Sequence, residues 1–489
     1  MRRAAVLSLV LLLLAAAAAS GAPRVVPGWP VVAPSGDVLP GPGGGAVVIG
    51  PTEDADTTTY YAASALRPNG KLLWRNVRVL DCGNCDFGQT PTALQPDGTY
   101  GPIGATGDDF WAVTRTGRRV DGCADVTLAN GTCIATRPEF TDLLSPPRWT
   151  VVARRGGAVV WRYEEPGFSA EIQGDVAPAV VADGAGRVYT ALGPPDVLTQ
   201  SPRLLALDAA SGALQWRRLG DLRPLAGLEE GVLARDGRSL VAIGPGGQTL
   251  WTTNAVPLAS ATPRVLLDAK RHVLYVGTGR TVVALDSRTG AVRWRTGTAE
   301  SALPLSVTDT GVLLAVARKT RREARAHTAA GRLIWRYRTA TDVEGALALD
   351  DGTAVVSTAD DLVTRIDPRR RAPRVRRARV TLSPRRIRTA CADVCGVPPL
   401  SGTTLRMALP RAAVLVVRVR TGGRVQVGPL RIAAPAGLSA TRILADRPLY
   451  RLRNGKRLYY RRAVVEVRWR AGGRGQVRRF PISVTPPPR

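Results

Sequence analysis

Several residue types that dominate catalytic and metal sites are scarce in this chain of 489 residues. It has two histidines and four lysines, and aromatic residues make up 5% of the sequence. His272 and His327 are too few for a histidine-rich centre, and both are predicted to lie on the surface. The chain also has no G-x-S-x-G, H-E-x-x-H or P-loop motif, so none of the corresponding enzyme classes is indicated.

Long apolar runs are missing everywhere except at the start. Residues 1–22 contain two arginines, an apolar run and then small residues, which is the pattern of a secretory signal peptide. No later stretch reaches the roughly 18 residues that a membrane-spanning helix needs. We therefore expect an exported mature protein, secreted or held in the cell envelope, with no transmembrane segment.

Cysteine is sparse, which limits the ways in which the chain can be cross-linked. Six cysteines allow 15 disulfide connectivities. Because they are close in sequence two by two, we predict local disulfides: Cys82–Cys85, Cys123–Cys133 and Cys391–Cys395. The spacing of Cys82 and Cys85 also fits half of a zinc site, but the chain has no second CxxC and no histidine pair to complete it.

Acidic residues nearly disappear after residue 367. Residues 368–489 hold 30 lysines and arginines against three acidic residues, which gives this stretch +27 of the total charge of +29. The rest of the chain is close to neutral. This shift predicts a large neutral region followed by a small, strongly basic domain.

The most informative feature is a repeat with the pattern A-x-D-x-x-x-G-x-x-x-W. Residues 206–216 and 284–294 match it fully, and shortened copies keep the G-x-x-x-W ending. The mean spacing of about 43 residues suits the four short strands of one propeller blade. The repeat residues, all assigned to packing, are Trp29, Trp74, Trp161, Asp208, Gly212, Trp216, Trp251, Asp286, Gly290, Trp294 and Trp335.

The type of each residue in the repeat can be explained by the role expected of it in a blade. Glycine allows a positive φ between the third and fourth strands, and aspartate accepts hydrogen bonds from turn amides. Tryptophan is large enough to fill the wedge between blades, and its buried N–H needs one acceptor. Within residues 262–294 the pattern predicts strands at 262–270, 272–279, 281–287 and 291–294.

The spacing gives eight repeats, of which the last lacks its final strand. Near Asp367 only the aspartate of the pattern remains. The segment "RVVPGW", which ends at Trp29, can supply the missing outermost strand and so close the ring. We therefore predict an all-β fold, an eight-bladed propeller over residues 23–375 closed by an N-terminal strand.

The repeat resembles that of the pyrroloquinoline-quinone-type (PQQ-like) eight-bladed propellers. This superfamily includes quinoprotein dehydrogenases and a non-enzymatic scaffold lipoprotein of outer-membrane assembly. The resemblance to the dehydrogenases implies an adjacent Cys-Cys pair, a calcium site and an aspartate base. This chain has no adjacent cysteines. Its acidic pairs, which include Glu164-Glu165 and Asp360-Asp361, are predicted to be solvated turns without calcium-loop spacing.

Residues 376–489 follow a longer strand alternation, which predicts an immunoglobulin-like β-sandwich. The hairpin 416–427 is expected to place Arg420 opposite Arg424. The hairpin 464–480 is expected to bury Val465, Val467 and Trp469 and to place Glu466 opposite Arg478. The outward arginines are anion-binding candidates, although a solvated strand face would give the same pattern: Arg418, Arg420, Arg424, Arg468, Arg470 and Arg478.

These features favour an exported, non-catalytic binding or scaffold protein of the cell envelope. No catalytic, cofactor or metal residue is assigned. The expected partner is a protein or an envelope polymer, with anionic lipid or polysaccharide for the basic domain, and nucleic acid is not expected. The alternative is a secreted quinoprotein-like oxidoreductase that uses PQQ and calcium. A sugar- or peptide-binding surface on the loop-rich face of the propeller is a third hypothesis.

Overall fold

The computed structural model describes the following residues: 23–55, 58–81, 93–103, 111–123, 126–139, 148–165, 180–192, 203–258, 263–278, 281–296, 302–317, 322–372, 374–384, 386–388, 403–422, 424–443, 450–453, 456–471 and 474–485. The predicted signal peptide, residues 1–22, lies outside them. The chain divides into two compact units. The first unit comprises residues 1–83, 312–328 and 332–489, and the second comprises residues 84–311 and 329–331.

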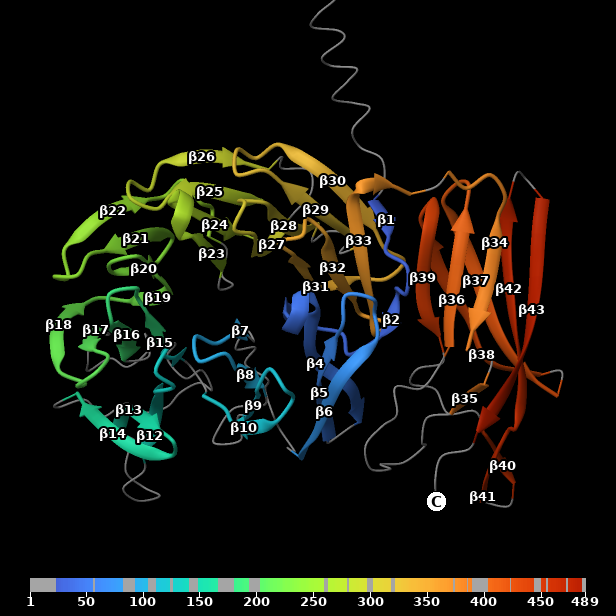
Figure 1. The fold of residues 1–489 in the computed structure, drawn as a ribbon, viewed down its shortest axis with the longest axis horizontal. Coiled ribbons are helices and arrows are strands. Elements are labelled where there is room, and N and C mark those ends of the chain that lie inside the picture. The colour runs from blue at the N-terminus through green and yellow to red at the C-terminus, as the bar shows by residue number, and fades with distance from the viewer. Residues whose placement is uncertain are drawn as a thin grey trace, which may run out of the picture. The chain divides into compact units, whose positions relative to one another are not determined.

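The second unit is built from four-stranded antiparallel meanders, drawn from cyan to yellow in Figure 1. Consecutive strands are neighbours in each sheet, because short turns connect them. The strands are β7 (Ala93–Leu94), β8 (Tyr100–Ile103), β9 (Trp111–Val113) and β10 (Arg119–Asp121); β11 (Val126–Thr127), β12 (Cys133–Glu139), β13 (Arg148–Arg155) and β14 (Ala158–Glu164); β15 (Val180–Ala182), β16 (Arg187–Leu192), β17 (Arg203–Asp208) and β18 (Leu214–Leu219); β19 (Leu222–Gly227), β20 (Val232–Asp236), β21 (Ser239–Ile243) and β22 (Thr249–Thr253); β23 (Arg264–Asp268), the 3-10 turn η2 (Ala269–Arg271), β24 (Val273–Gly277), β25 (Val282–Asp286) and β26 (Val292–Arg295); and β27 (Ala302–Val307).

The four strands predicted within residues 262–294 are confirmed by β23 to β26.

The first unit begins with strands of the same kind. They are β1 (Pro23–Val25), β2 (Val31–Val32), β3 (Asp37–Pro40), the 3-10 turn η1 (Pro42–Gly44), β4 (Ala46–Ala55), β5 (Thr58–Leu66), β6 (Leu72–Asp81), β28 (Leu313–Ala317), β29 (Glu323–His327), β30 (Leu333–Arg338), β31 (Val343–Ala348), β32 (Ala354–Thr358) and β33 (Leu362–Arg371). The chain is therefore all-β with repeated four-stranded sheets, as expected of a β-propeller. That these sheets number eight blades in one ring stays a prediction.

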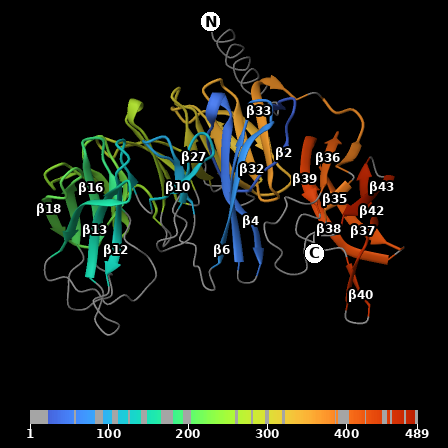
Figure 2. The same cartoon turned by 60° about the horizontal axis from the view of Figure 1, so that its bottom comes forward.

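The two ends of the propeller sequence share one sheet, as predicted. Strand β1 pairs antiparallel with β33, with Arg24 opposite Asp367, and β2 pairs with the beginning of β33. Figure 2 shows β2 beside β33. Trp29 lies between β1 and β2 and is 4% exposed. Pairing through the N-terminal segment covers the edge of β33, which would otherwise be open to another strand.

Alanine and tryptophan of the repeat face each other across the last two strands of a sheet. Ala206 pairs with Trp216, and Ala284 pairs with Trp294. Directly after each alanine the register shifts by a β-bulge. A bulge adds one residue to one strand and increases the local twist. The small alanine, fully buried, leaves room for the indole opposite.

In the second unit the repeat tryptophans Trp161, Trp216, Trp251 and Trp294 pack on the glycine turn of the following repeat. The indole N–H of Trp251 donates to the carbonyl oxygen of Ser287 at 3.0 Å, and that of Trp161 to Ala209 at 3.1 Å. A Cβ placed on Gly290 would lie only 2.5 Å from Cε3 of Trp251. Glycine is therefore required at this position for two reasons: its φ is +71°, and the indole leaves no room for a side chain.

The same arrangement recurs at other repeats. Equivalent indole bonds join Trp216 to Pro245 (2.8 Å), Trp294 to Ala329 (2.7 Å) and, in the first unit, Trp29 to Pro68 (3.0 Å). Trp335 is 5% exposed and pairs with Ala326, while the half-buried Trp74 pairs with Ala65. The repeat is thus a packing unit whose members contact each other across consecutive sheets.

The aspartates of the repeat close the turns, as predicted. The carboxylate of Asp286 accepts hydrogen bonds from the amides of Arg288 and Thr289 at 3.0 and 3.1 Å. Asp208 accepts the equivalent bonds from Ala210 and Ser211. Hydrogen bonds from the Ser211 side chain to Asp208 and from the Arg293 side chain to Asp286 lower the pKa of these carboxyl groups, and the amide bonds add to the shift because they too favour the ionised form.

The C-terminal part of the first unit contains two sheets around one hydrophobic cluster. One sheet has the order β34-β36-β39, and the other has the order β35-β43-β42-β37-β38. Leu405 and Met407 of the first sheet and Val417 and Val465 of the second belong to the same core. The strands are β34 (Arg379–Ser383), β35 (Arg386–Arg388), β36 (Thr403–Leu409), β37 (Ala413–Thr421), β38 (Arg424–Ala434), β39 (Gly437–Ile443), β42 (Arg462–Ala471) and β43 (Arg474–Thr485), with a separate hairpin of β40 (Tyr450–Arg453) and β41 (Lys456–Tyr459).

Two packed sheets agree with a sandwich, while its immunoglobulin-like character and its boundary at residue 376 stay predictions.

Candidate functional site

The outer face of the five-stranded sheet is centred on a single carboxylate. Glu466 lies in β42, and its side chain is 1% exposed. It accepts hydrogen bonds from Nε of Arg468 at 2.8 Å and from Nε of Arg479 at 3.0 Å. A terminal nitrogen of Arg420 lies 4.0 Å away, and Arg418 is the backbone partner of Glu466 on β37. The hydrogen bond from Arg479 and the further arginines lower the pKa of Glu466 despite its burial.

The sequence placed this hairpin one residue out of register. Val465, Val467 and Trp469 are buried, as predicted. Glu466, however, pairs with Arg479, and Arg478 pairs with Val467. The sequence did not identify Arg479 as the partner of Glu466. Alternation of apolar and polar residues shows which side chains of a strand share a face, but it does not show which residue of the next strand lies opposite. Arg478 therefore lies on the face of Val467 rather than on that of Glu466.

The predicted pairing of Arg420 with Arg424 is also wrong. Thr421 pairs with Arg424, and Arg420 pairs with Val425. Register shifts on either side of Val419 account for the difference, since bulges cannot be read from alternation alone. The two arginines thus avoid the like-charge juxtaposition that the predicted register implied.

Valine alternates with arginine on this outer face. Val477 is opposite Arg468, and it is 49% exposed. Val425, opposite Arg420, is 44% exposed. We call this surface the arginine–valine face; it comprises Arg418, Arg420, Arg468, Arg479, Val425 and Val477, with Glu466 at its centre. Its arginines exceed its carboxylates four to one, so it can attract anions, while the valines can contact apolar groups beside them.

Three predicted arginines lie outside the face. Besides Arg478, these are Arg424 at the start of β38 and Arg470 near the end of β42, and both are exposed. Arg470 pairs with Gly475. Neither has an ion pair within the described part of the chain. The structure thus brings four arginines together around Glu466 and leaves Arg424, Arg470 and Arg478 around this cluster's margin.

Two acidic residues that were predicted to lie in solvated turns are buried instead. The carboxylate of Glu165 accepts hydrogen bonds from Arg203 at 2.7 Å, Arg217 at 3.2 Å and Tyr163. Burial, reinforced by the bond to Glu165, raises the pKa of Tyr163 well above its ordinary value. These carboxylates are paired with arginine because an isolated buried charge is costly.

Asp361, the second of them, binds Arg442 and the backbone N–H of Ser35. Its backbone has a φ of +55°, which is strained for a residue with a side chain. The backbone N–H of Arg442 also donates to Asp360 at 2.6 Å. Burial raises the pKa of Asp361 although Arg442 opposes the shift. Both aspartates therefore act as anchors between β39 and the last sheet of the propeller repeats.

One histidine also lies elsewhere than predicted. His272 is partly exposed, and its Nδ1 lies 2.8 Å from a carboxylate oxygen of Glu229. His327, predicted to lie on the surface, is 6% exposed. Among the described residues, no group of three His, Cys, Asp or Glu side chains is placed to hold a metal ion.

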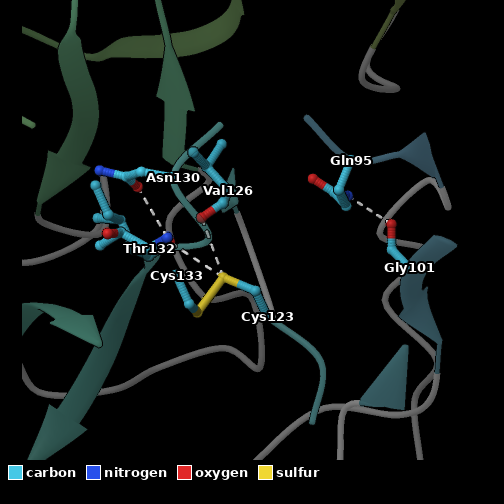
Figure 3. Close-up of a disulfide and its surroundings, with 8 residues drawn as sticks. Gln95, Gly101, Cys123, Val126, Asn130, Thr132 and Cys133 are labelled. Carbon is cyan, nitrogen blue, oxygen red and sulfur yellow. Dashed lines mark hydrogen bonds between the residues drawn. A yellow bond between two sulfur atoms is a disulfide. The ribbon is translucent and has the colours of Figure 1, made fainter. Parts of the chain in front are cut away.

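One predicted disulfide is present, between Cys123 and Cys133 (Figure 3). Their Cα atoms are 5.4 Å apart, at a sequence separation of 10. Within the loop the backbone N–H of Thr132 donates to the side-chain oxygen of Asn130 at 3.0 Å. The disulfide ties the segment before β11 to the first residue of β12. The other predicted pairs, Cys82–Cys85 and Cys391–Cys395, lie outside the described residues.

A known protein family accounts for most of this architecture. The family described as outer membrane protein assembly factor BamB matches residues 148–302 and 281–483. The chain belongs to the BamB family. The repeats that pack tryptophan on glycine are therefore PQQ-like propeller repeats. No curated protein matches the chain.

Solved structures similar to this BamB-family chain are distant in sequence. BamB from Moraxella catarrhalis is 15% identical, with 70% of this chain and 99% of that chain covered and a TM-score of 0.43. Quinohemoprotein alcohol dehydrogenase from Comamonas testosteroni is 12% identical, with 72% and 77% covered and a TM-score of 0.45. The WD40 β-propeller domain of Doa1 is 10% identical, with 71% and 97% covered and a TM-score of 0.32.

In the described part of this BamB-family chain, no helix has both the length and the apolar character needed to cross a bilayer.

Proposed function

We propose that this protein is an exported, non-catalytic scaffold of the cell envelope whose C-terminal domain contacts an anionic surface or polymer. Membership of the BamB family supports a protein-binding propeller. The proposal of an anionic partner rests on the arginine–valine face, where Arg420, Arg468 and Arg479 share the carboxylate of Glu466 and Arg418 lies beside it on β37. A disulfide between Cys123 and Cys133 agrees with an oxidising compartment outside the cytoplasm.

The chemistry of the face favours an anionic partner over simple solvation. Glu466 can neutralise one of the four surrounding guanidinium groups, so the cluster keeps a positive charge above its buried centre. Guanidinium groups pair with phosphate and carboxylate through two parallel hydrogen bonds. Exposed valines such as Val477 would meet the apolar parts of the same partner.

Binding of the mature chain to vesicles tests this proposal. Vesicles of phosphatidylglycerol in phosphatidylcholine, and separately the anionic polysaccharide alginate, are mixed with protein at rising ionic strength. We expect retention that weakens with salt, because screening acts on exposed charges. The double variant Arg468→Gln/Arg470→Gln removes one arginine of the face and the arginine at its margin two residues further along β42. It should bind phosphatidylglycerol about tenfold more weakly, at about 1 kcal/mol per arginine near an anionic membrane.

The matched control is Arg295→Gln/Arg336→Gln, which removes the same charge from the exposed outer strands β26 and β30. It should leave binding within about twofold of the parent chain. Equal losses in both variants would mean that only the net charge matters, and the arginine–valine face would no longer be a site. Absence of salt-sensitive retention on both materials would remove the anionic-partner proposal altogether.

The competing proposal is a secreted quinoprotein-like oxidoreductase that requires PQQ and calcium. The buried carboxylates are poor candidates for a calcium site, because Glu165, Asp361 and Glu466 are each held by arginine. The two proposals are separated by incubating the protein with PQQ and calcium and then recording the quinone absorbance and dye-linked dehydrogenase activity. Sustained turnover above that of free quinone would refute the non-catalytic reading.

A further inference from the structure

A cavity of about 300 Å³ lies where the N-terminal segment joins the last sheet of the propeller repeats. Residues 24–27, which include the end of β1, line it together with residues of β33 and of the turn before β32. This volume is at the lower end of the range for small-molecule sites. The lining residues are Arg24, Val25, Val26, Pro27, Pro68, Asp351, Thr353, Arg365, Asp367, Arg369 and Arg370.

The inner part of this cavity is fixed by a buried arginine. Arg365 is 4% exposed, and its guanidinium donates to Asp351 at 2.6 Å, to Thr353 at 2.9 Å and to the carbonyl oxygen of Gly44 at 3.0 Å. These bonds use all three of its nitrogens. Arg365 therefore shapes the site and holds Asp351, and its charge is already balanced there.

Three further arginines leave an excess of positive charge at the cavity. Asp367 pairs with Arg369 at 3.0 Å and more loosely with Arg370 at 3.5 Å. The side chains of these two arginines are 64% and 70% exposed. Arg24 lies opposite Asp367 on β1, and it forms no ion pair within the described part of the chain. Two carboxylates thus face four guanidinium groups.

The bonds from Arg369 and Arg370 outweigh the desolvation of Asp367 and lower the pKa of its carboxyl group. The carboxylate therefore stays ionised near neutral pH, and the cavity keeps an excess of two positive charges. The remaining lining is apolar, with Val25, Val26, Pro27 and Pro68 close to the charged groups. A ligand suited to this lining is an anion that also carries a short apolar group.

We propose that this cavity binds a small organic anion, whose phosphate or carboxylate group is held by Arg24, Arg369 and Arg370 and whose apolar part contacts Val25 and Pro27. Because residues of both β1 and β33 line the cavity, a bound ligand contacts the two strands that join the ends of the propeller sequence. Binding therefore stabilises this pairing, by the general rule that a ligand selective for the folded state raises its stability. This site is separate from the arginine–valine face.

The test uses monobutyl phosphate, inorganic phosphate and vesicles that contain phosphatidate, each added to the mature chain. Calorimetry gives the affinity, and thermal unfolding gives the stabilisation. Monobutyl phosphate should bind about tenfold more tightly than inorganic phosphate, since burial of two or more methylene groups contributes about 0.8 kcal/mol each. The double variant Arg24→Gln/Arg370→Gln should lose at least tenfold in affinity for monobutyl phosphate.

Both replaced side chains have weak or no ion pairs, so the double variant should retain the parent circular dichroism spectrum. Arg295→Gln/Arg336→Gln is the charge-matched control and should bind monobutyl phosphate as the parent chain does. Arg468→Gln/Arg470→Gln should also bind normally, which separates this site from the proposed function. Binding of phosphatidate vesicles that is lost in Arg24→Gln/Arg370→Gln would support the same site with a lipid headgroup as its ligand.

Two results would overturn the proposal. One is equal binding of monobutyl phosphate and inorganic phosphate, which would exclude an apolar wall. The other is equal affinity of the parent chain and the Arg24→Gln/Arg370→Gln variant for every probe.

Discussion

The contact between Trp251 and Gly290 can be tested with a single methyl group. Gly290→Ala places a Cβ 2.5 Å from Cε3 and 2.8 Å from Cδ2 of the indole, at a φ of +71°. The left-handed backbone alone costs alanine about 1–2 kcal/mol. Overpacking against the ring adds about 1–3 kcal/mol. We therefore expect the free energy of unfolding to fall by about 2–5 kcal/mol.

Gly186→Ala isolates the backbone cost. Gly186 has a φ of +83°, and a Cβ there would meet nothing within 4 Å. This variant should lose only about 1–2 kcal/mol. Guanidinium-induced unfolding of both variants, followed by tryptophan fluorescence and circular dichroism with the disulfide intact, gives the difference.

A double-mutant cycle makes the assignment specific. Trp251→Ala alone should cost about 3–5 kcal/mol, because it leaves a cavity. In the Trp251→Ala background, Gly290→Ala should cost no more than Gly186→Ala, since the ring is gone. If Gly290→Ala and Gly186→Ala differ by less than about 0.5 kcal/mol in the parent chain, the idea that indoles pack on the repeat glycines is refuted.

Trp29→Ala should lower the free energy of unfolding by about 3–5 kcal/mol, and Trp29→Phe by less, in denaturant titrations; equal effects would argue against a role for indole burial. Replacing Cys123 and Cys133 together by serine should lower the free energy of unfolding by about 2–3 kcal/mol in the same assay. An unchanged free energy would mean that the disulfide does not stabilise the fold. Because hydrogen bonds, first of all from Arg293, lower the pKa of Asp286, its stabilising contribution is present above the unfolded value near 3.8 and is lost as pH falls through the lower folded value. Unfolding midpoints measured between pH 5 and 2 should therefore decline less for Asp286→Asn than for the parent chain. Glu466→Gln should cost about 1 kcal/mol, since the two arginines that donate to it, Arg468 and Arg479, are exposed, and should strengthen binding to phosphatidylglycerol vesicles; weaker binding would contradict the proposed face.

Much of the propeller could be predicted from local pattern. The alternation and turn residues at 262–294 located four strands, and the spacing of tryptophans identified the N-terminal segment around Trp29 as the partner of β33. These predictions succeed because each repeat is locally encoded, with short turns that leave each strand few alternative neighbours. The predicted roles of Asp208 and Asp286 in turns were confirmed for the same reason.

The pairing of charged side chains could not be predicted in this way. Glu165 meets Arg203 and Arg217 from later strands, and Asp361 meets Arg442 from β39. Such partners are distant in sequence. In the sequence alone, a pair of acidic residues that becomes buried therefore looks the same as a pair in a solvated turn. Likewise, bulges near Val419 moved the register of a hairpin whose faces were otherwise correct.

The sequence by itself determined the all-β class, the repeat unit, the strand that covers β33 and the strongly basic C-terminal region, because strand periodicity, turn chemistry and net charge are properties of neighbouring residues. Only the tertiary structure decided that the indoles lie on the glycines of the next repeat. It also decided that Glu466 pairs with Arg479 rather than Arg478, and that Arg24 and Arg370 line the same cavity. Those contacts join residues that become neighbours only after the chain has folded, and their geometry depends on bulges and packing that no local pattern records.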